Sequence, residues 1–557
     1  MEKIWLASYP AGVAPEIDSG AHASLAEVIE DSCRTFAGKT AYISLGRALS
    51  YAGLDHRSRA FAAWLQARGL GRGERVALMM PNLLQYPICL FGAWRAGCTV
   101  VSCNPLYTPR ELAHQLADSG ARAIVVADNF AATLQQALPQ TALEHVVVTS
   151  IGEQLGWPRG PVVDFVVRRV KRMVPAWSLP GARRLRDVLA EGERLPHAAP
   201  ALGHANLACL QYTGGTTGVA KGAMLTHGNL IANLCQAHAW VRPLVKEGRE
   251  CVVTALPLYH IFALTANCLT FLKIGASNLL IVNPRDIPAF VRELRKTPFS
   301  CITGVNTLFN ALLDHPGFAR LDFSRLRLTL GGGMAVQHSV AERWRAVTGK
   351  PLAQAYGLTE TSPAVTINPL DAPVFTGSIG LPVPSTELSI RDEQGKELPL
   401  GETGEICVRG PQVTPGYWQR PDETALSFHA DGFLRTGDMG YVDPQGYVFL
   451  VDRKKDMILV SGFNVYPNEI EDVVALHPGV REVAAVGVPD ARSGEAVKLF
   501  VIRKDPDLDA AALIAYCRAN LTGYKVPRSV EFRTELPRTN VGKILRRQLR
   551  DEAGRPA

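Results

Sequence analysis

A run of glycine, threonine and lysine between two apolar segments is the part of the sequence best suited to chemistry. Residues 210–227 read LQYTGGTTGVAKGAMLTH and hold four glycines, four threonines and one lysine, Lys221. Glycine permits close backbone approach, and threonine hydroxyls can donate hydrogen bonds to anionic oxygens. Such a loop could surround phosphate groups with backbone N–H groups, with Lys221 as a point charge. This stretch alone leaves open a flexible, glycine-rich surface turn.

The commonest phosphate loop, G-x-x-x-x-G-K-[ST], does not fit this run. Ala220 precedes Lys221 and Gly222 follows it, so both positions that flank the lysine of that motif fail. The glycines of GLGRGERVALMM (69–80) do not form a dinucleotide fingerprint, because they follow a predicted helix and precede a predicted strand. A phosphate site here must be of another type.

The elements around this run indicate an α/β protein with more than one domain, because 557 residues exceed what one hydrophobic core usually supports. Apolar runs that are typical of buried strands alternate with helical patterns, which predicts layered parallel sheets. The strands are predicted at 75–81, 98–105 and 121–128, and the helices at 86–97 and 110–120.

Beyond residue 370 the pattern changes to short alternating strands with Gly, Pro and Asp turns, which predicts a β-rich subdomain of antiparallel hairpins. A compact helix, strand, strand, helix pattern follows. We therefore expect a large N-terminal α/β domain over 1–455 and a small, mobile α+β C-terminal domain over 456–557. The charged VDRKKD stretch would form the junction.

Bulk composition restricts the partners and the compartment. A net charge of +7 over this length does not demand nucleic acid, and it suits anionic substrates or an anionic membrane surface. The eleven cysteines show no CxxC pair and no zinc spacing, which favours a reducing cytoplasm. The N-terminus, MEKIWLASYPAGVAPEID, does not have the pattern of a signal peptide. The oligomeric state stays open, a homodimer included.

Two segments raise the question of a membrane. Residues 251–272 carry no charge, but Pro257 and His260 favour a buried strand, turn and helix over a spanning helix. Residues 162–177, VVDFVVRRVKRMVPAW, place Val163, Val166, Val167, Val170 and Met173 or Val174 on one helical face, with Trp177 beyond Pro175. Arg168, Arg169, Lys171 and Arg172 flank that face. This is typical of an interfacial helix on the inner, anionic face of the cell membrane, although a helix packed on its own domain is the alternative.

Five stretches together resemble the motifs of adenylate-forming enzymes, the acyl-CoA synthetase and luciferase superfamily. They are YTGGTTGVAKG (212–222), LPLYH (256–260), YGLTE (356–360), RTGD (435–438) and TNVGKILRR (539–547). The segment DGFLRTGDMGYVDPQGYVFLVDRKK (431–455) is similar to the signature of fatty acyl-CoA synthetases. The likeness covers nearly the whole chain and is to bacterial long-chain fatty-acid–CoA ligases of the β-oxidation type.

The resemblance implies a two-step reaction. A carboxylate attacks the α-phosphate of ATP to give an acyl-adenylate and pyrophosphate, and the thiol of coenzyme A then displaces AMP. Mg²⁺ would neutralise the pyrophosphate. Both steps need charge stabilisation more than covalent participation of the protein.

The resemblance also assigns residues to roles. Lys543, Glu360 and His260 would act at the reacting groups, with Thr213 and Glu360 placing Mg²⁺. Lys455 would be the hinge on which the C-terminal domain rotates, and Gly462 would line the coenzyme A tunnel. The acyl pocket would be formed at Gly304, Gly331, Gly332 and Gly333. ATP and AMP would be bound by Thr213, Gly214, Gly215, Thr216, Thr217, Gly218, Lys221, Tyr356, Gly357, Thr359, Asp438 and Arg453.

Taken singly, most of these residues have an ordinary structural alternative: His260 could be a core histidine, Asp438 a turn residue and Lys543 part of a cationic helix face. The chain also departs from the family pattern at Ala355, Gly228, Phe433 and Arg435, where Gly, Arg, Trp and His are usual. These departures leave the acyl chain length open. Another acid, aromatic or of medium length, and a noncatalytic lipid-binding protein are the alternative functions.

Overall fold

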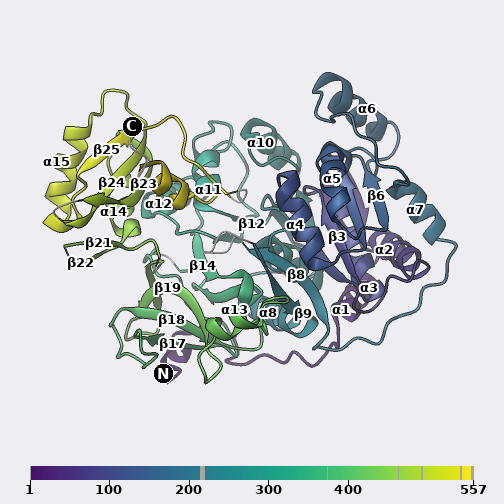
Figure 1. The fold of residues 1–557 in the computed structure, drawn as a ribbon, viewed down its shortest axis with the longest axis horizontal. Coiled ribbons are helices and arrows are strands. Elements are labelled where there is room, and N and C mark those ends of the chain that lie inside the picture. Colours follow the sequence, from purple (N-terminus) through teal and green to yellow (C-terminus); the bar gives the residue numbers. More distant parts are fainter. Residues whose placement is uncertain are drawn as a thin grey trace.

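The computed structural model describes residues 2–213, 220–372, 374–453, 455–461, 463–490, 493–539 and 542–553. Two large sheets and one smaller sheet occupy the part of the chain before residue 454, and a further sheet belongs to the C-terminal part (Figure 1). This is the expected α/β class, with a large layered N-terminal domain, a β-rich subdomain and a C-terminal domain. The boundary after residue 455 stays a prediction.

The first large sheet contains mainly parallel strands in the described part of the chain. Its strands, in spatial order, are β16 (Leu381–Pro382), β15 (Ala364–Ile367), β14 (Ala353–Gly357), β13 (Leu328–Gly331), β12 (Cys301–Gly304), β10 (Cys251–Thr254), β11 (Ser277–Leu280), β1 (Thr40–Ser44) and β2 (Arg47–Ser50). Strands β10 to β14 are parallel, and β15 and β16 extend the sheet antiparallel. The carboxyl ends of the parallel strands therefore meet at one edge, where α/β proteins bind ligands.

The second large sheet carries the glycine–threonine run at one side. Its order is β7 (Arg183–Arg184), β6 (His145–Thr149), β5 (Ala123–Ala127), β3 (Arg75–Met79), β4 (Thr99–Ser102), β8 (Leu207–Thr213) and β9 (Lys221–Thr226). Strands β4 and β5 are buried throughout, as the continuous apolar runs of parallel strands require. Strands β8 and β9 pair antiparallel, with Thr213 opposite Lys221. The strands predicted at 75–81, 98–105 and 121–128 are thus confirmed.

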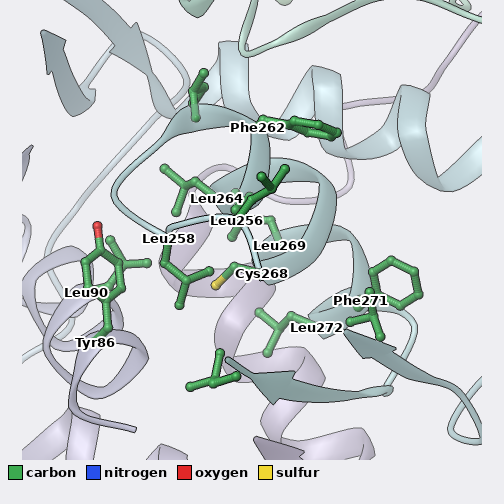
Figure 2. Close-up of a cluster of buried hydrophobic side chains, with 14 of the residues drawn as sticks. Tyr86, Leu90, Leu256, Leu258, Phe262, Leu264, Cys268, Leu269, Phe271 and Leu272 are labelled. Atoms are coloured by element: carbon green, nitrogen blue, oxygen red, sulfur yellow. The ribbon is translucent and has the colours of Figure 1, made fainter. Parts of the chain in front are cut away.

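The core lies between these two sheets. Every residue of α3 (Gln85–Ala96) is buried. Tyr86 and Leu90 of this helix face Leu258, which follows β10 of the other sheet (Figure 2). The side chain of Asn82 donates hydrogen bonds to the carbonyls of Thr254 and Leu256, at 3.0 and 2.9 Å. One hydrophobic cluster therefore holds both sheets in a fixed relation.

The remaining helices before residue 454 cover the sheets. They are α1 (Leu25–Thr35), α2 (Tyr51–Gln66), α4 (Pro109–Ser119), α5 (Ala131–Ala137), α6 (Arg159–Phe165), α7 (Leu185–Gly192), α8 (His227–Val241), α9 (Thr270–Lys273), α10 (Ile287–Lys296), α11 (Asn306–Leu313), α12 (His338–Thr348) and α13 (Pro421–Ser427). Capping boxes start α4 at Thr108 and α8 at Thr226, so the sequence fixes these two helix starts locally.

The uncharged stretch 251–272 forms β10, a π-helical segment (Ala263–Leu269) and α9, as the buried alternative predicted. In the described part of the chain, no helix combines the length and the apolar character needed to cross a bilayer.

The β-rich subdomain is an antiparallel sheet of β17 (Glu387–Arg391), β18 (Gly404–Arg409), β19 (Leu434–Val442) and β20 (Val448–Arg453). The C-terminal sheet contains β22 (Phe463–Val465), β21 (Ile458–Val460), β24 (Gly494–Arg503), β23 (Val480–Asp490) and β25 (Ser529–Phe532). Helices α14 (Pro467–Ala475), α15 (Ala510–Asn520) and α16 (Arg546–Ala553) pack against it. Two hydrophobic clusters lie wholly within this C-terminal part, so it has a core of its own.

Segment 157–173 differs from the interfacial helix that the sequence predicts. Helix α6 continues as a π-helical segment from Val166 to Val170. Val163 packs against the main core and Trp177 against the second core cluster. The exposed apolar side chains are Trp157, Val162, Phe165, Val170 and Met173, of which Val170 and Met173 belong to the predicted face. The exposed apolar face is therefore shifted from the predicted one, because Val163, Val166 and Val167 are half-buried.

The contact between α7 and α2 gives a test of the packing. A Cβ atom at Gly192 would lie 1.9 Å from the carbonyl oxygen of Ala60. We expect Gly192→Ala to destabilise the fold by about 1–3 kcal/mol, because the helices must move apart. The measurement is the midpoint of thermal unfolding, with Gly38→Ala as the control, since a Cβ there meets nothing within 4 Å. Equal midpoints for the two variants would contradict the close packing.

Candidate nucleotide and acyl site

Three residues that are distant in the sequence meet at the edge where the parallel strands end. Tyr356, at the end of β14, donates a hydrogen bond from its phenol to Asp438 Oδ2 at 2.7 Å. Arg453, at the end of β20, lies with its Nε 3.3 Å from Asp438 Oδ1. Asp438 on β19 is buried, so its charge is partnered rather than solvated. Burial, and then Asp438, raise the pKa of Tyr356 well above its usual value, so the phenol stays protonated.

Lys543 reaches the same place from the C-terminal domain. A cleft between the domains is lined by Tyr356, Asp438, Arg453 and Lys543 together. The turn before the lysine lies against helix α11, since a Cβ at Gly542 would be 2.9 Å from Thr307 Oγ1. Burial lowers the pKa of Lys543 to about 8, with a smaller lowering by Arg453 and an opposing effect of Asp438. Lys543 is therefore still largely charged at neutral pH, yet close to titrating.

A second group of predicted site residues lies around Lys221 and Glu360. Glu360, in a short 3-10 turn (Thr359–Thr361), accepts a hydrogen bond at Oε1 from the phenol of Tyr417 at 2.7 Å. Lys221 forms an ion pair with Glu423, and its Nζ lies 5.2 Å from the ring centroid of Tyr417. Tyr417 thus contacts both charged residues, Glu360 through its phenol and Lys221 through its ring.

Some predicted site residues lie apart from this cleft or outside the description. His260 does not line the cleft, and burial lowers its pKa to about 4, so the imidazole is neutral. Its Nδ1 accepts a hydrogen bond from the backbone N–H of Phe262 at 3.3 Å, and the residue is half-buried. Six of the residues predicted to contact ATP or coenzyme A lie outside the described residues: Gly214, Gly215, Thr216, Thr217, Gly218 and Gly462.

The predicted acyl-pocket glycines are closely packed except for Gly333. A Cβ at Gly331 would lie 2.6 Å from Val336, and one at Gly332 would lie 3.0 Å from Phe262. At Gly304 the ring of Phe309 would be 2.9 Å away. Gly333 has a φ of +76° and lines the cleft beside Ala355 and Gly357. The space that these glycines leave is therefore taken up by apolar side chains in this structure.

Three of the four departures from the family pattern lie apart from the cleft, whereas Ala355 lines it. A side chain at Gly228 would meet His204 Cβ at 2.9 Å, so an arginine would require His204 to shift. Phe433 is buried, with the guanidinium groups of Arg391 and Arg409 4.4 and 4.7 Å from its ring centroid. Arg435 pairs with Glu405 at 3.5 Å. In the described part of the chain, none of these substitutions removes a residue that lines the cleft.

Sequence motifs missed an ionic cluster at the domain junction. Arg546 lies 2.6 Å from Glu471 on α14 and 3.4 Å from Asp452 at the end of β20. The backbone N–H of Asn468 donates to Asp452 Oδ2 at 2.9 Å. Burial raises the pKa of Asp452 to about 6 despite the guanidinium. Charged runs such as DRKK and KILRR signal charge but not pairing, so only the fold brings these groups together.

Lys455 lies next to this cluster, at the predicted hinge. Its carbonyl accepts a hydrogen bond from Arg550 at 3.4 Å. Burial, followed by Arg453, lowers its pKa. Tyr417 and Glu423 were missed as well, because neither lies in one of the five motifs and no local pattern pairs them with Glu360 or Lys221.

Comparison with known proteins identifies the family. The AMP-binding enzyme model matches residues 29–418, and the AMP-binding enzyme C-terminal domain model matches residues 469–543. The long-chain-fatty-acid–CoA ligase of Escherichia coli O6:H1 is 59% identical over 99% of both chains. The solved structure of anthranilate CoA ligase AuaEII with anthranoyl-AMP has a TM-score of 0.84 at 26% identity, covering 95% of this chain and 97% of that one. ATP-bound MatB from Rhodopseudomonas palustris has a TM-score of 0.81 at 30% identity, covering 95% and 98%. The chain belongs to the AMP-binding enzyme family and, within it, to the long-chain-fatty-acid–CoA ligases.

Proposed function

We propose that this enzyme activates long-chain fatty acids with ATP, forms acyl-adenylate and pyrophosphate, and transfers the acyl group to coenzyme A with release of AMP. The observation that carries the proposal is the meeting of Lys543 with Tyr356, Asp438 and Arg453 in one cleft. Family membership supplies the reaction class, and the 59% identity to a long-chain ligase supports the substrate class. The acyl-CoA product would feed β-oxidation.

The nucleoside would be held at Asp438. Its carboxylate can accept hydrogen bonds from both ribose hydroxyls, and charge-assisted bonds of this kind are strong. The ring of Tyr356 offers an apolar face to the adenine, while Arg453 can reach the ribose or a phosphate. A Cβ atom at Gly357 would lie 1.9 Å from the carbonyl oxygen of Pro363, so a side chain there would disturb the same segment.

Magnesium would be bound with the nucleotide rather than in a preformed protein cage. Among the described residues there is no group of three or more His, Cys, Asp or Glu side chains that could hold a metal ion. Mg²⁺ bound to nucleotide phosphates needs only one or two protein oxygens, which Thr213 and Glu360 can supply. The hydrogen bond from Tyr417 uses one oxygen of Glu360 and leaves the other for the ion. When bound, the ion would neutralise charge on the pyrophosphate.

Lys543 would stabilise the transition state of the first step. Attack of a carboxylate on the α-phosphate brings two anions together, and an ammonium group in a partly buried cleft offsets their repulsion. In the described part of the chain no ion pair fixes Lys543, so it is available to a substrate and can leave again.

Rotation of the C-terminal domain about Lys455 would then move Lys543 out of the cleft and bring Gly462 to a tunnel for pantetheine. We propose the domain boundary after residue 455 for this reason.

The apolar side chains around Gly331, Gly332 and Gly304 would give way to the acyl chain. Phe262 and Val336 fill the space beside the strand ends and are both hydrophobic. A fatty acyl chain could replace these contacts without burying polar groups. His260, neutral and bonded to the backbone of Phe262, would border the adenylate rather than carry charge.

A membrane contact at segment 157–173 would supply the fatty acid. Trp157 is 88% exposed and Phe165 is 61% exposed. Large apolar side chains exposed together in one segment are unusual on a protein surface. Arg169, Lys171 and Arg172 are exposed beside them, whereas Arg168 pairs with Asp128. The segment projects at the far end of the molecule from the C-terminal domain (Figure 1). Apolar and basic groups together favour an anionic lipid surface, which would place this cytoplasmic enzyme peripherally on the inner face of the membrane.

The function is tested by incubating the purified protein with ATP, Mg²⁺, coenzyme A and a series of acids from butyrate to stearate, with aromatic acids included. We expect AMP and thioesters of the long-chain acids, read by mass spectrometry. Lys543→Ala should lose pyrophosphate release while still converting supplied acyl-adenylate to thioester. Thioesters from aromatic or short acids alone would overturn the substrate class, and no product from any acid would overturn the enzyme.

The pKa of Lys543 predicts a pH dependence. The ammonium form is the active one, so kcat/KM for ATP in pyrophosphate release should fall as pH rises through about 8. The phosphates of bound ATP raise the pKa of a nearby lysine, so kcat should fall at higher pH than kcat/KM. In Lys543→Arg the charge persists, and the residual rate should lack this limb. A kcat/KM that stays level through about pH 9.5, more than one pH unit above that pKa, would contradict the assignment.

Membrane binding is tested by co-sedimentation with phosphatidylglycerol vesicles at low and high salt. Replacing Trp157 and Phe165 by Ala should weaken binding at both salt concentrations, whereas reversing the charges of Arg169, Lys171 and Arg172 should remove its salt sensitivity. Leu426→Ala is the control, because Leu426 is 73% exposed elsewhere on the surface. Unchanged binding in all variants would exclude this segment as the contact.

A further inference from the structure

The segment 414–424, here called the bracket segment, is hydrogen-bonded to strand β9 and to the turn that carries Glu360. The backbone N–H of Thr414 donates to Glu360 O at 2.7 Å. Met224 N–H donates to Gly416 O at 2.9 Å, and Trp418 N–H donates to Gly222 O at 2.8 Å. These backbone contacts fix where the side chains of the bracket segment lie relative to the first residue of β9, Lys221.

Glu423 uses this fixed position to hold Lys221. Its Oε2 forms an ion pair with the Lys221 ammonium. The lysine side chain is 14% exposed and the glutamate side chain 35%, so the pair is only partly screened by solvent. The Tyr417 ring lies beside the ammonium, and the Tyr417 phenol donates to Glu360. The carboxylate of Glu423 is therefore already the charged partner of Lys221. Under the proposed function, Lys221 lies at the edge of the phosphate site.

We propose that Glu423 is an internal competitor of the nucleotide's pyrophosphate end for Lys221. This inference rests on the proposed function, which makes the region around Lys221 a phosphate site. A carboxylate oxygen and a phosphate oxygen are both anionic acceptors for the same ammonium group. A phosphate oxygen of ATP that bonds the Lys221 ammonium weakens its pair with Glu423, and the pair is restored when pyrophosphate leaves. Glu423 is thus a positioning residue that acts through Lys221.

The competition distinguishes the ligands by their phosphates. Lys221 lies opposite Thr213 at the base of the glycine–threonine run, whereas Asp438 and Tyr356 form the proposed nucleoside end of the site. Ligands with the pyrophosphate group, ATP and inorganic pyrophosphate, meet Glu423. AMP, which lacks this group, binds at the nucleoside end without displacing it. Removing the charge of Glu423 should therefore affect the first two ligands and leave AMP unchanged.

The test is calorimetric titration of the full-length protein and of Glu423→Gln with inorganic pyrophosphate, ATP and AMP, each with Mg²⁺. Glutamine keeps the shape of the side chain and removes its charge. We expect Glu423→Gln to bind pyrophosphate and ATP about five- to tenfold more tightly, with unchanged AMP affinity. Slower pyrophosphate release should lower kcat while KM for ATP falls.

Asp422→Asn is the matched control. Asp422 is the exposed neighbour of Glu423 in the first turn of α13, so the variant makes the same change in net charge one residue away. It should leave the affinities for pyrophosphate, ATP and AMP as they are in the wild type.

Several outcomes would overturn the inference. Unchanged or weaker pyrophosphate binding by Glu423→Gln would mean that Glu423 does not compete, and an equal gain in Asp422→Asn would mean that only net charge matters. AMP affinity checks that the variant is folded. If the wild type bound neither ATP nor AMP, the proposed function itself would fall, and this inference with it.

Discussion

Under the proposed function, the site depends on one constraint: Lys543 must stay charged in a partly buried cleft without being locked there. Burial alone lowers the pKa of this lysine toward neutrality. A direct ion pair would restore the charge but would also hold the lysine in place and compete with an anionic substrate. The protein instead sets Asp438 at a distance, already engaged with Tyr356 and Arg453. That carboxylate supports the ammonium through the field of the cleft.

The rest of the fold serves to bring these groups together from separate elements. Tyr356 ends a strand of the first large sheet, Asp438 and Arg453 lie on neighbouring strands of the subdomain, and Lys543 comes from the C-terminal domain. The core between the two large sheets keeps the strand that carries Tyr356 fixed. The cluster of Arg546, Asp452 and Asn468 joins the end of the subdomain to the C-terminal domain. These side chains are largely buried, so each charge depends on its partner across the junction.

The phosphate side follows the same principle. Lys221 and Glu360 carry opposite charges near the glycine–threonine run, and Tyr417 stands between them. Each of these charged side chains already has a protein partner before a nucleotide binds, Glu423 for the lysine and the phenol for the glutamate. This arrangement avoids an unpaired, partly buried charge in the free enzyme. Under the proposed function, ligand phosphates would exchange with these protein groups rather than with water alone.

The sequence by itself determined the α/β class, the positions of the main strands, the antiparallel subdomain and the family motifs. These features follow from local patterns: buried apolar runs, capping residues such as Thr108 and Thr226, and short stretches with a fixed spacing. The sequence also indicated that 251–272 is buried rather than membrane-spanning, because Pro257 interrupts any continuous helix.

Only the tertiary structure decided which groups are partners. Glu423 and Lys221 lie 202 positions apart along the chain, and no periodicity links them. The exposed face of 157–173 could not be taken from its helical pattern, because Val163 packs against the core while Trp157 and Phe165 are exposed. Likewise Phe262 and Val336 fill the space beside Gly331 and Gly332, a fact of packing that the glycines alone do not encode. Local patterns specify elements, whereas pairing, burial and pKa depend on which elements the fold brings into contact.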